Sequence, residues 1–554
     1  MWREVAWFEV RLQRREFLSA IYVAVFFFLT FGYTSSGAIE LVSERGLVPK
    51  NSPWALAHAM AGVTAFGQVI TTMITATAVM RDVATRQQEL LFATRLTRRD
   101  YLLGRWFGAL AVMLVVYAAV PVGLVAGTLM PWVDTTTLLP FGTNAYLRPL
   151  ALLVLPNLVV VSALFFTAGA MRRSFMTILL LGVGLVALWS TGVAFARDGH
   201  VFGVLIDPFG NAALEHATRS WNEGERRTNA IPMGGWLIAN RALWLAIGGA
   251  ALAALARAFR FEVLTAPDRG RRMDHPPRVA AVPSAPPPPS PRAPSIWHSL
   301  VTEGRWIFRW TLRERGFVTL MSLGALNALA NAWRAGGVDP TAGDVLGAVQ
   351  EHARLFLILV ATIYAGELVW RERDVRVDGL SDVVPVGTGT LVAGKLLGLL
   401  AAQLVLVAPL AVVALAVGFA RGAEGLTPVL ALRWIGGFVF PFVAQLTLLS
   451  LLVHAVVQHK VAGHVLLITG WVAAVAMERS LALPPLLRYA NLPHYTWNAT
   501  SGFGGAGVTL GWFALYWSAV AGACGTLAIA WWVRGVPMSW AHRIRTALRQ
   551  LQRA

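Results

Sequence analysis

The sequence has a single cysteine, Cys524, and a small share of charged residues. One cysteine excludes an internal disulfide framework and any cluster of cysteine ligands around a metal. Charged residues make up 14% of the chain, whereas a soluble domain has about 25%. Hydrophobic residues make up 56%. This composition excludes a set of soluble domains and indicates a membrane protein.

Long runs without charge account for that composition. The runs 55–80 and 176–196 exceed the roughly 18 apolar residues that cross a bilayer as a helix. Runs of this kind predict an all-α polytopic protein with about twelve transmembrane helices. They lie near 18–36, 55–80, 105–130, 149–171, 175–196 and 235–258, and near 317–333, 354–371, 394–420, 433–457, 461–478 and 509–533. The seventh is short and contains Asn327 and Asn331.

Basic residues outnumber acidic residues, 47 to 29, which gives a formal net charge of +18. In a soluble protein that excess would suggest a nucleic-acid partner. Here most of the lysines and arginines fall on one side of the membrane when the N-terminus is placed in the cytoplasm, as the positive-inside rule requires. We therefore expect a lipid bilayer and no nucleic acid as the partner, with both termini cytoplasmic.

A proline-rich, basic segment divides the chain. Residues 262–299 hold 10 of the 28 prolines. This composition cannot bury a core, so the segment is expected to be an extended cytoplasmic linker. It separates two stretches of nearly equal length, 1–261 and 300–554, each with six predicted spans.

The two stretches carry similar motifs in the same order. The corresponding motifs are FEVRLQRREF at 8–17 with FRWTLRERGF at 308–317, Gly104-Arg105-x-x-Gly108 with Gly394-Lys395-x-x-Gly398, and, across a two-residue gap, Arg81-Asp82 with Arg373-Asp374. Their shared order predicts two parallel six-helix repeats, each preceded by an interfacial amphipathic helix. Six spans per half place equivalent loops on the same, cytoplasmic side.

The candidate catalytic motifs are incomplete. Residues 389–396 approach the pattern of a phosphate-binding loop, but Leu396 has no hydroxyl for Mg²⁺ and the segment enters a span. Lys395, like Arg105 in the first half, is therefore expected to extend toward the membrane interface. No His-Glu-x-x-His motif occurs, so no metal-dependent peptidase activity is expected. We expect the chain itself to hydrolyse no nucleotide and to hold neither a metal nor a cofactor.

Few polar residues lie within the predicted spans. Their amides could line a substrate path or join neighbouring helices by hydrogen bonds, and the sequence leaves both roles open. These residues are Gln68, Asn157, Gln403 and Gln445. Glu367 is expected to pair with Arg371 one turn later, and Arg241 is expected to extend toward the interface.

In each half, one charged stretch follows the second span. Residues 81–103 alternate apolar and charged side chains, and 371–392 is their counterpart. A helix on an anionic membrane surface explains the pattern, and so does a docking site for a cytoplasmic partner. The docking role is favoured because both halves keep such a stretch.

Motifs along most of the chain resemble those of one transporter family. They are FEVRLQRREF before span one, RDVATRQQELLFATRLTRRDYLLGR after span two, LMPW at 129–132, DPFG at 207–210, YAGELVWRERD at 364–374 and YWSAVAGACGTLAIAWWVRG near the end. The chain resembles ABC-type exporter permeases of the type-2 family, and more narrowly the membrane half of bacterial permease/metallo-aminopeptidase fusions. The resemblance implies a pore-forming subunit of the bacterial inner membrane, with ATP and Mg²⁺ bound by separate ATPase subunits, two per chain. Peptidase activity is not carried over, because its motif is missing.

By the same resemblance, the charged stretches are coupling segments that contact the ATPases. The candidate coupling residues are Arg81, Asp82, Arg86, Glu89, Arg98, Arg99 and Asp100 in the first half and Arg373, Asp374 and Asp382 in the second. Two other functions stay open: a secondary transporter with two parallel six-span halves, and a membrane scaffold that anchors a partner enzyme. A lipid, peptide or hydrophobic small molecule would suit the apolar bundle as substrate.

Overall fold

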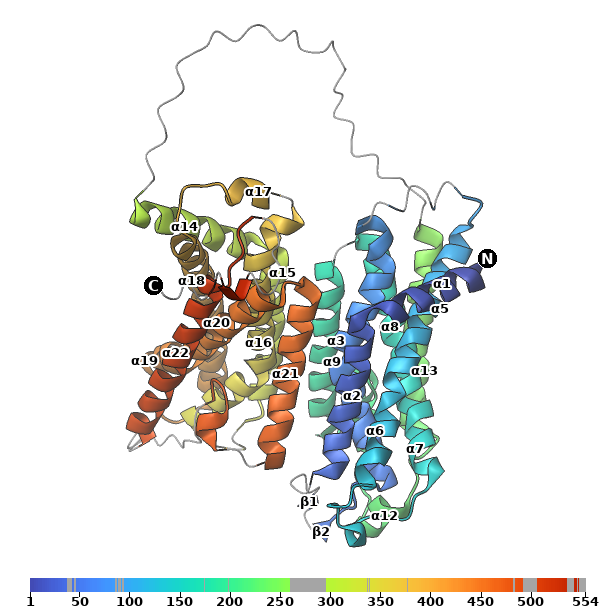
Figure 1. Ribbon diagram of the computed structural model, residues 1–554. Coiled ribbons are helices and arrows are strands. Elements are labelled where there is room, and N and C mark those ends of the chain that lie inside the picture. Colours follow the sequence, from blue (N-terminus) through green and yellow to red (C-terminus); the bar gives the residue numbers. More distant parts are fainter. Residues whose placement is uncertain are drawn as a thin grey trace.

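The computed structural model is almost entirely helical (Figure 1). It describes residues 1–36, 42–43, 46–84, 87, 91, 94–173, 175–197, 199–259, 295–335, 337, 339–375, 377–481, 484–491, 506–535, 543–545 and 547. Within these residues the only sheet is an antiparallel pair, β1 (Val42–Ser43) and β2 (Gly46–Leu47), with Val42 opposite Leu47. The predicted linker lies almost wholly outside the described residues.

The helices of the first half alternate long apolar segments with short connecting ones. They are α1 (Trp2–Arg15), α2 (Phe17–Ser35), α3 (Pro53–Ala84), α5 (Arg98–Tyr117), α6 (Ala119–Thr128), η1 (Thr135–Thr137), α7 (Thr143–Pro149), η2 (Leu150–Val154), α8 (Leu155–Arg172), α9 (Phe175–Arg197), α10 (Val201–Ile206), α11 (Asn211–Thr218), α12 (Glu223–Thr228) and α13 (Gly235–Ala258).

The second half has the same alternation. Its elements are α14 (Ile296–Arg313), α15 (Arg315–Ala332), α16 (Ala342–Asp374), α17 (Asp378–Ser381), α18 (Thr388–Arg421), α19 (Pro428–Trp434), η3 (Ile435–Val439), α20 (Phe440–Val457), α21 (Lys460–Leu481), η4 (Pro485–Leu487) and α22 (Ala506–Ala530).

In the described part of the chain, nine helical segments are long and apolar enough to cross a membrane, and α3 adds a tenth if its bent pair of segments is one span. These ten coincide with predicted spans. Helices α15 and α21 fill the other two predicted positions, and α15 does not meet the same criterion. Its polar residues Asn327 and Asn331 interrupt the apolar run and explain this. Several side chains of α21 lie outside the described residues, so its span stays a prediction. The chain is a multi-pass membrane protein, and nine to ten of the twelve predicted spans are found as candidate spans within the described residues.

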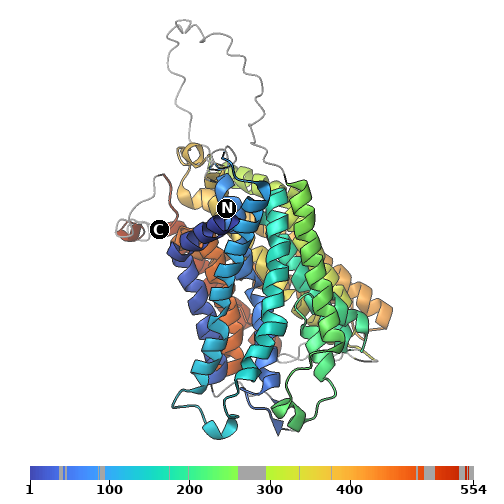
Figure 2. The same ribbon diagram turned by 90° about the vertical axis from the view of Figure 1, so that its right-hand side faces the viewer.

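Helices α1, α14 and α17 lie at one end of the molecule, which we call the N-terminal end (Figures 1 and 2). Helix α12 and the β1–β2 pair lie at the opposite end. The described parts of both charged stretches belong to the N-terminal end: in the first, Trp2 N donates to Asp100 Oδ1 (3.1 Å), and the second contains α17 (Figure 1). Both stretches thus lie on the same side, as predicted.

A five-residue π-helix interrupts one long span in each half, at Leu150–Val154 and at Ile435–Val439. Pro156 and Pro441 follow close behind. A proline has no N–H for the regular i→i−4 bond, so a locally widened turn accommodates it without a sharp kink. Each span then ends on a residue with positive φ, Arg173 (50°) or Gln458 (56°).

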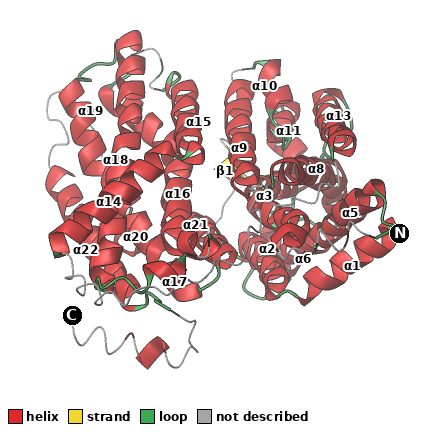
Figure 3. Ribbon diagram, turned by 90° about the horizontal axis from the view of Figure 1, so that it is seen from above, coloured by secondary structure: helices red, strands yellow, loops and turns green. Residues whose placement is uncertain are grey.

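One helix of each half also packs against the other half across their interface. Helix α9 packs against α15, and α21 packs against α2 and α3 (Figure 3). Leu179 and Val183 of α9 accordingly belong to the hydrophobic core of the second half, and Val465 of α21 belongs to that of the first. Near the opposite end, the guanidinium of Arg334 lies 4.4 Å from the ring centre of Phe195.

Glycines let α1 and α14 lie close against α5 and α18. Gly104 and Gly108 face α1, and Gly394 and Gly398 face α14. A methyl group added at Gly398 would overlap the carbonyl oxygen of Gly304 and come within 2.9 Å of Ile307 Cβ. The backbone cannot yield as a flexible side chain does, so Gly398 accepts no larger residue without a shift of α14.

We expect Gly398→Ala to lower the melting temperature of the purified protein, because overpacking typically costs about 1–3 kcal/mol. The matched control is Gly249→Ala in α13, where an added methyl group meets no atom within 4 Å. Thermal unfolding in detergent measures both. Equal melting temperatures for the two variants would contradict the close packing of α14 on α18.

Candidate functional site

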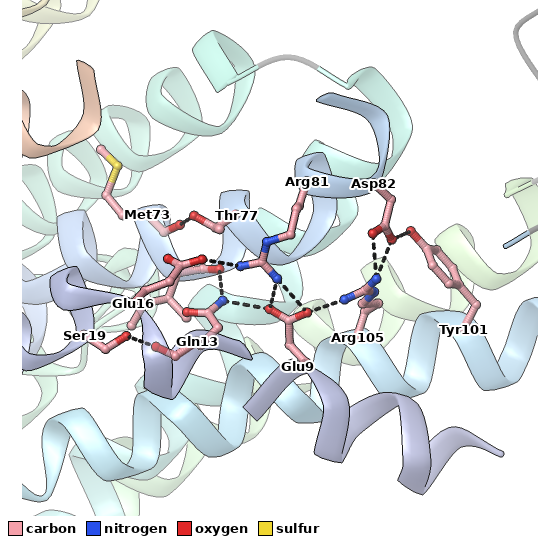
Figure 4. A network of polar contacts seen from close by, with 11 residues as sticks. Glu9, Gln13, Glu16, Ser19, Met73, Thr77, Arg81, Asp82, Tyr101 and Arg105 are labelled. Atoms are coloured by element: carbon pink, nitrogen blue, oxygen red, sulfur yellow. Dashed lines mark hydrogen bonds and ion pairs between the residues drawn. The ribbon is translucent and has the colours of Figure 1, made fainter. Parts of the chain in front are cut away.

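A buried ion-pair network joins α1 to α3 and α5 at the N-terminal end (Figure 4). Glu9 of α1 is fully buried and its carboxylate pairs with two arginines. Arg81 Nη1 lies 3.1 Å from Glu9 Oε1, and Arg105 Nη1 contacts Glu9 Oε2. Arg105 Nη2 also binds both oxygens of Asp82, at 2.6 and 2.7 Å. The Arg105 guanidinium thus joins carboxylates from two helices.

Neighbouring groups satisfy most of the remaining atoms of this network, although Arg105 Nε has no hydrogen-bond partner among the described residues. The Tyr101 hydroxyl donates to Asp82 Oδ2 at 2.9 Å, and Gln13 Nε2 donates to Glu9 Oε1 at 2.9 Å. Arg81 Nη2 lies 3.0 Å from Glu16 Oε1. Spacings of four residues (Glu9 with Gln13, Tyr101 with Arg105) place each pair on one helix face. These ion pairs and hydrogen bonds offset the cost of removing the charged groups from water.

The second half has a related network around Lys395 and Lys460. Lys395 Nζ lies 2.5 Å from Glu372 Oε1, and its side chain is 2% exposed. Lys460 Nζ lies 2.6 Å from Glu367 Oε1 and 2.7 Å from Asp374 Oδ2. These contacts tie α16 to α18 and to α21.

Three sequence-based predictions about these charged residues are wrong. Arg105 and Lys395 do not extend toward the interface, because each is buried in an ion pair. Glu367 pairs with Lys460, not with Arg371. The Arg371 guanidinium instead lies 3.9 Å from the ring centre of Trp310. In each case the partner comes from another helix, far away in the sequence.

The first-half coupling candidates separate into internal and exposed groups. Arg81 and Asp82 belong to the buried network. Arg98 and Arg99 are exposed, and Arg98 Nη1 donates to Phe259 O at 3.2 Å. Asp100 is bound to the start of α1 through Trp2 N, as noted above. The remaining two, Arg86 and Glu89, lie outside the described residues.

The second-half candidates surround the short helix α17. Asp374 pairs with Lys460, and Arg373 Nη2 donates to Val533 O at 3.2 Å. Asp382 Oδ2 accepts from Gly535 N at 2.6 Å. All three therefore hold the loop between α16 and α18 in place.

That loop exposes apolar side chains at the end of the bundle. Leu380 is 74% exposed and Val383 is 77% exposed, and Val375 and Val377 are exposed as well. Large exposed apolar residues clustered in one place commonly mark an interaction surface. We call the residues 375–384, without 376, the α17 loop.

Arg534, just after α22, fixes the α17 loop to the last span. Its guanidinium donates to the carbonyl oxygens of Val386 (2.6 Å), Asp382 (2.9 Å) and Val384 (3.0 Å). An arginine provides five donors in a rigid fork, which suits several carbonyls at once. The loop is therefore ordered before any partner binds it.

The four membrane polar residues make hydrogen bonds between helices. Gln68 Nε2 donates to Gly182 O (3.0 Å) and Gln403 Nε2 to Thr447 Oγ1 (3.0 Å). Gln445 Nε2 donates to Ser518 Oγ at 3.2 Å. Gln445 also lines a pocket with space for about one water molecule. Helix-to-helix bonding, one of the two predicted roles, is confirmed.

The fourth residue, Asn157, belongs to a buried polar cluster in the first half. Arg241 Nη1 donates to Asn157 Oδ1 at 2.6 Å, and Asn157 Nδ2 donates to Phe209 O at 3.0 Å. Arg241 is 4% exposed, so its predicted extension to the interface is wrong. Asp207 caps the following turn by accepting from Phe209 N (2.8 Å) and Ala212 N (2.7 Å). The DPFG sequence thus forms the predicted turn before a helix.

Burial raises the pKa of Asp207 from 3.8 to about 6. Between about pH 4 and pH 6 the folded protein keeps a proton that the unfolded chain has lost, so stability should fall as the pH rises through this range. We expect Asp207→Asn to flatten this dependence. Thermal unfolding of both proteins from pH 4 to pH 7 measures it, and parallel curves would contradict the assignment.

Several residues of the site were missed at the sequence level. Glu9, Tyr101 and Glu372 were not singled out, although the spacing of Glu9 with Gln13 and of Tyr101 with Arg105 indicates one face of a helix. Arg534 and Leu380 carried no local signal. Their importance comes from contacts between segments about 150 residues apart in the chain.

Comparison of the sequence with models of protein families and with curated proteins finds no match.

Proposed function

We propose that this chain is the membrane subunit of an ATP-binding-cassette exporter, which forms the substrate path and is driven by separate ATPase subunits. The proposal combines a multi-pass helical bundle, both charged stretches at one end, and a resemblance in motifs to type-2 permeases. ATP and Mg²⁺ would bind to the partner.

The α17 loop is the observation that carries the proposal. It is short, projects at the N-terminal end, exposes Leu380 and Val383, and is held by Arg534 before any partner arrives. A loop that is already ordered and exposes apolar side chains suits insertion into a groove on a soluble partner. Binding then costs little conformational entropy, because the loop does not have to be ordered on binding. Its position between two long spans allows a force on the loop to reach the bundle.

We also propose that the two halves are parallel repeats with two docking surfaces. Asp82 pairs with Arg105 and Glu372 pairs with Lys395, each across 23 residues. The equal spacing aligns Arg81-Asp82 of the first half with Arg371-Glu372 of the second half without a gap. The alignment of Arg81-Asp82 with Arg373-Asp374, by contrast, requires a two-residue gap. The matched π-helices and the reciprocal packing of α9 and α21 also support a twofold relation.

In this proposal the buried networks act as positioning groups. Arg81 and Asp82 fix the end of α3, and Arg98 and Arg99 offer exposed charge to the partner. Arg373, Asp374 and Asp382 hold the α17 loop in the second half. The export substrate would be apolar, in keeping with the bundle.

The test is co-purification with an ATPase that has a complete phosphate-binding loop and is encoded beside this chain. We expect Leu380→Asp to reduce co-purification at least about tenfold, because burying an unpaired charge in the groove is unfavourable. Asp344→Asn, at the far start of α16, is the control. Equal co-purification of both variants would reject the docking surface.

The two rival functions give different results in the same preparation. Transport driven by a proton gradient without any ATPase would favour a secondary transporter. Loss of the partner through Leu380→Asp, without any change in export, would favour a scaffold.

A further inference from the structure

The outward faces of α1 and α14 combine aromatic residues with arginines. Phe8 of α1 is 53% exposed and Trp306 of α14 is 47% exposed. Three and seven residues later, each helix carries an exposed arginine: Arg11 and Arg15 in α1, Arg309 and Arg313 in α14. The same aromatic-x-x-Arg-x-x-x-Arg pattern therefore occurs in both helices.

Each arginine pair places like charges one helical turn apart. Such i,i+4 pairs destabilise a helix unless an anion lies between or beside them. None of the four has a carboxylate of the described residues within ion-pair distance. The repeated like-charge pair thus favours a negatively charged ligand.

Most carboxylates of these helices point the other way. Glu9 is buried in the network, and Glu16 pairs with Arg81. Glu314 caps α15 by accepting from Phe317 N at 2.7 Å and also accepts from the Tyr364 hydroxyl. The outer face is left strongly basic, with Glu4 as its exposed acid.

We infer that α1 and α14 each bind the phosphate of an anionic phospholipid through Arg11 and Arg15 or Arg309 and Arg313. Both helices lie across the ends of the spans (Figure 1), where lipid headgroups are found. Arginine binds phosphate oxygens in a bidentate manner. Phe8 and Trp306 anchor the same faces among the acyl chains near the headgroups.

The purified full chain, without any ATPase, is reconstituted in phosphatidylcholine bilayers that contain a minor share of spin-labelled phosphatidylglycerol. We expect the intact protein to select the anionic lipid over labelled phosphatidylcholine. Replacing all four arginines by glutamine should reduce this selectivity at least about fivefold. Since no ATPase is present, the outcome does not depend on the proposed function.

The control is Arg197→Gln with Arg219→Gln, two exposed arginines toward the opposite end, which should leave the selectivity unchanged. Equal losses in the two variants would overturn the site, since general charge would then explain the selectivity. Inorganic phosphate is added as a competitor in a second series. Full displacement of the lipid by free phosphate would also overturn the inference.

Discussion

Replacing Arg105 by leucine is expected to destabilise the protein by about 3–5 kcal/mol, because it leaves Glu9 and Asp82 buried without their shared cation. Both carboxylates are at most 1% exposed. Chemical unfolding in detergent, followed by tryptophan fluorescence, measures the loss. Helix α1 should detach first, which protease digestion near the N-terminus detects.

Two further variants make that experiment specific. Arg98→Leu removes an exposed arginine from the same helix and should change stability by less than about 0.5 kcal/mol. Arg105→Lys keeps the charge but loses the fork, so it should recover only part of the stability. If Arg105→Leu were as stable as Arg98→Leu, the buried network would have no energetic importance.

Replacing Arg534 by alanine is expected to weaken ATPase binding at least about tenfold. The variant releases the carbonyls of Asp382 and Val384 in the α17 loop and that of Val386 just after it, so the loop must be ordered again during docking. Fixing the backbone of one residue costs about 1–2 kcal/mol, and about 1.4 kcal/mol already changes an affinity tenfold. Binding of the ATPase to the detergent-solubilised chain measures the effect.

Hydrogen exchange of residues 378–386 provides a readout that needs no partner. Exchange should be faster in Arg534→Ala and unchanged in Arg545→Ala, an exposed arginine of the same C-terminal region. Faster exchange with unchanged ATPase binding would support the hydrogen bonds from Arg534 to the loop as a structural finding but reject their role in coupling. Unchanged exchange would show that these hydrogen bonds do not order the loop.

The sequence was sufficient to locate most of the helices. Uncharged length alone identifies α2 and α9, because a bilayer span needs little else. It overestimated α15, where the polar residues Asn327 and Asn331 are interspersed among apolar ones. Asn327 donates to His352 O of α16, so the helix packs through hydrogen bonds as well as apolar contacts.

The ionic contacts could not be read from the sequence in the same way. Sequence spacing predicted that Glu367 pairs with its neighbour Arg371, and that Arg105 and Lys395 extend toward the membrane interface. The actual partners lie 96 residues away for Arg105 and Glu9, and on another span for Glu367 and Lys460. A charged side chain in an apolar environment pairs with the opposite charge that tertiary packing places beside it. Spacing along one helix therefore does not predict its ion-pair partner.

The packing of α9 and α21 against the opposite half has a consequence for biosynthesis. Helix α9 is made long before α15, so Leu179 and Val183 meet lipid first and protein only later. The first half must therefore remain folded in the bilayer, with this face of α9 exposed to lipid, until the spans of the second half are inserted. A translational pause or a truncation after α13 would expose this face of α9 to membrane quality control.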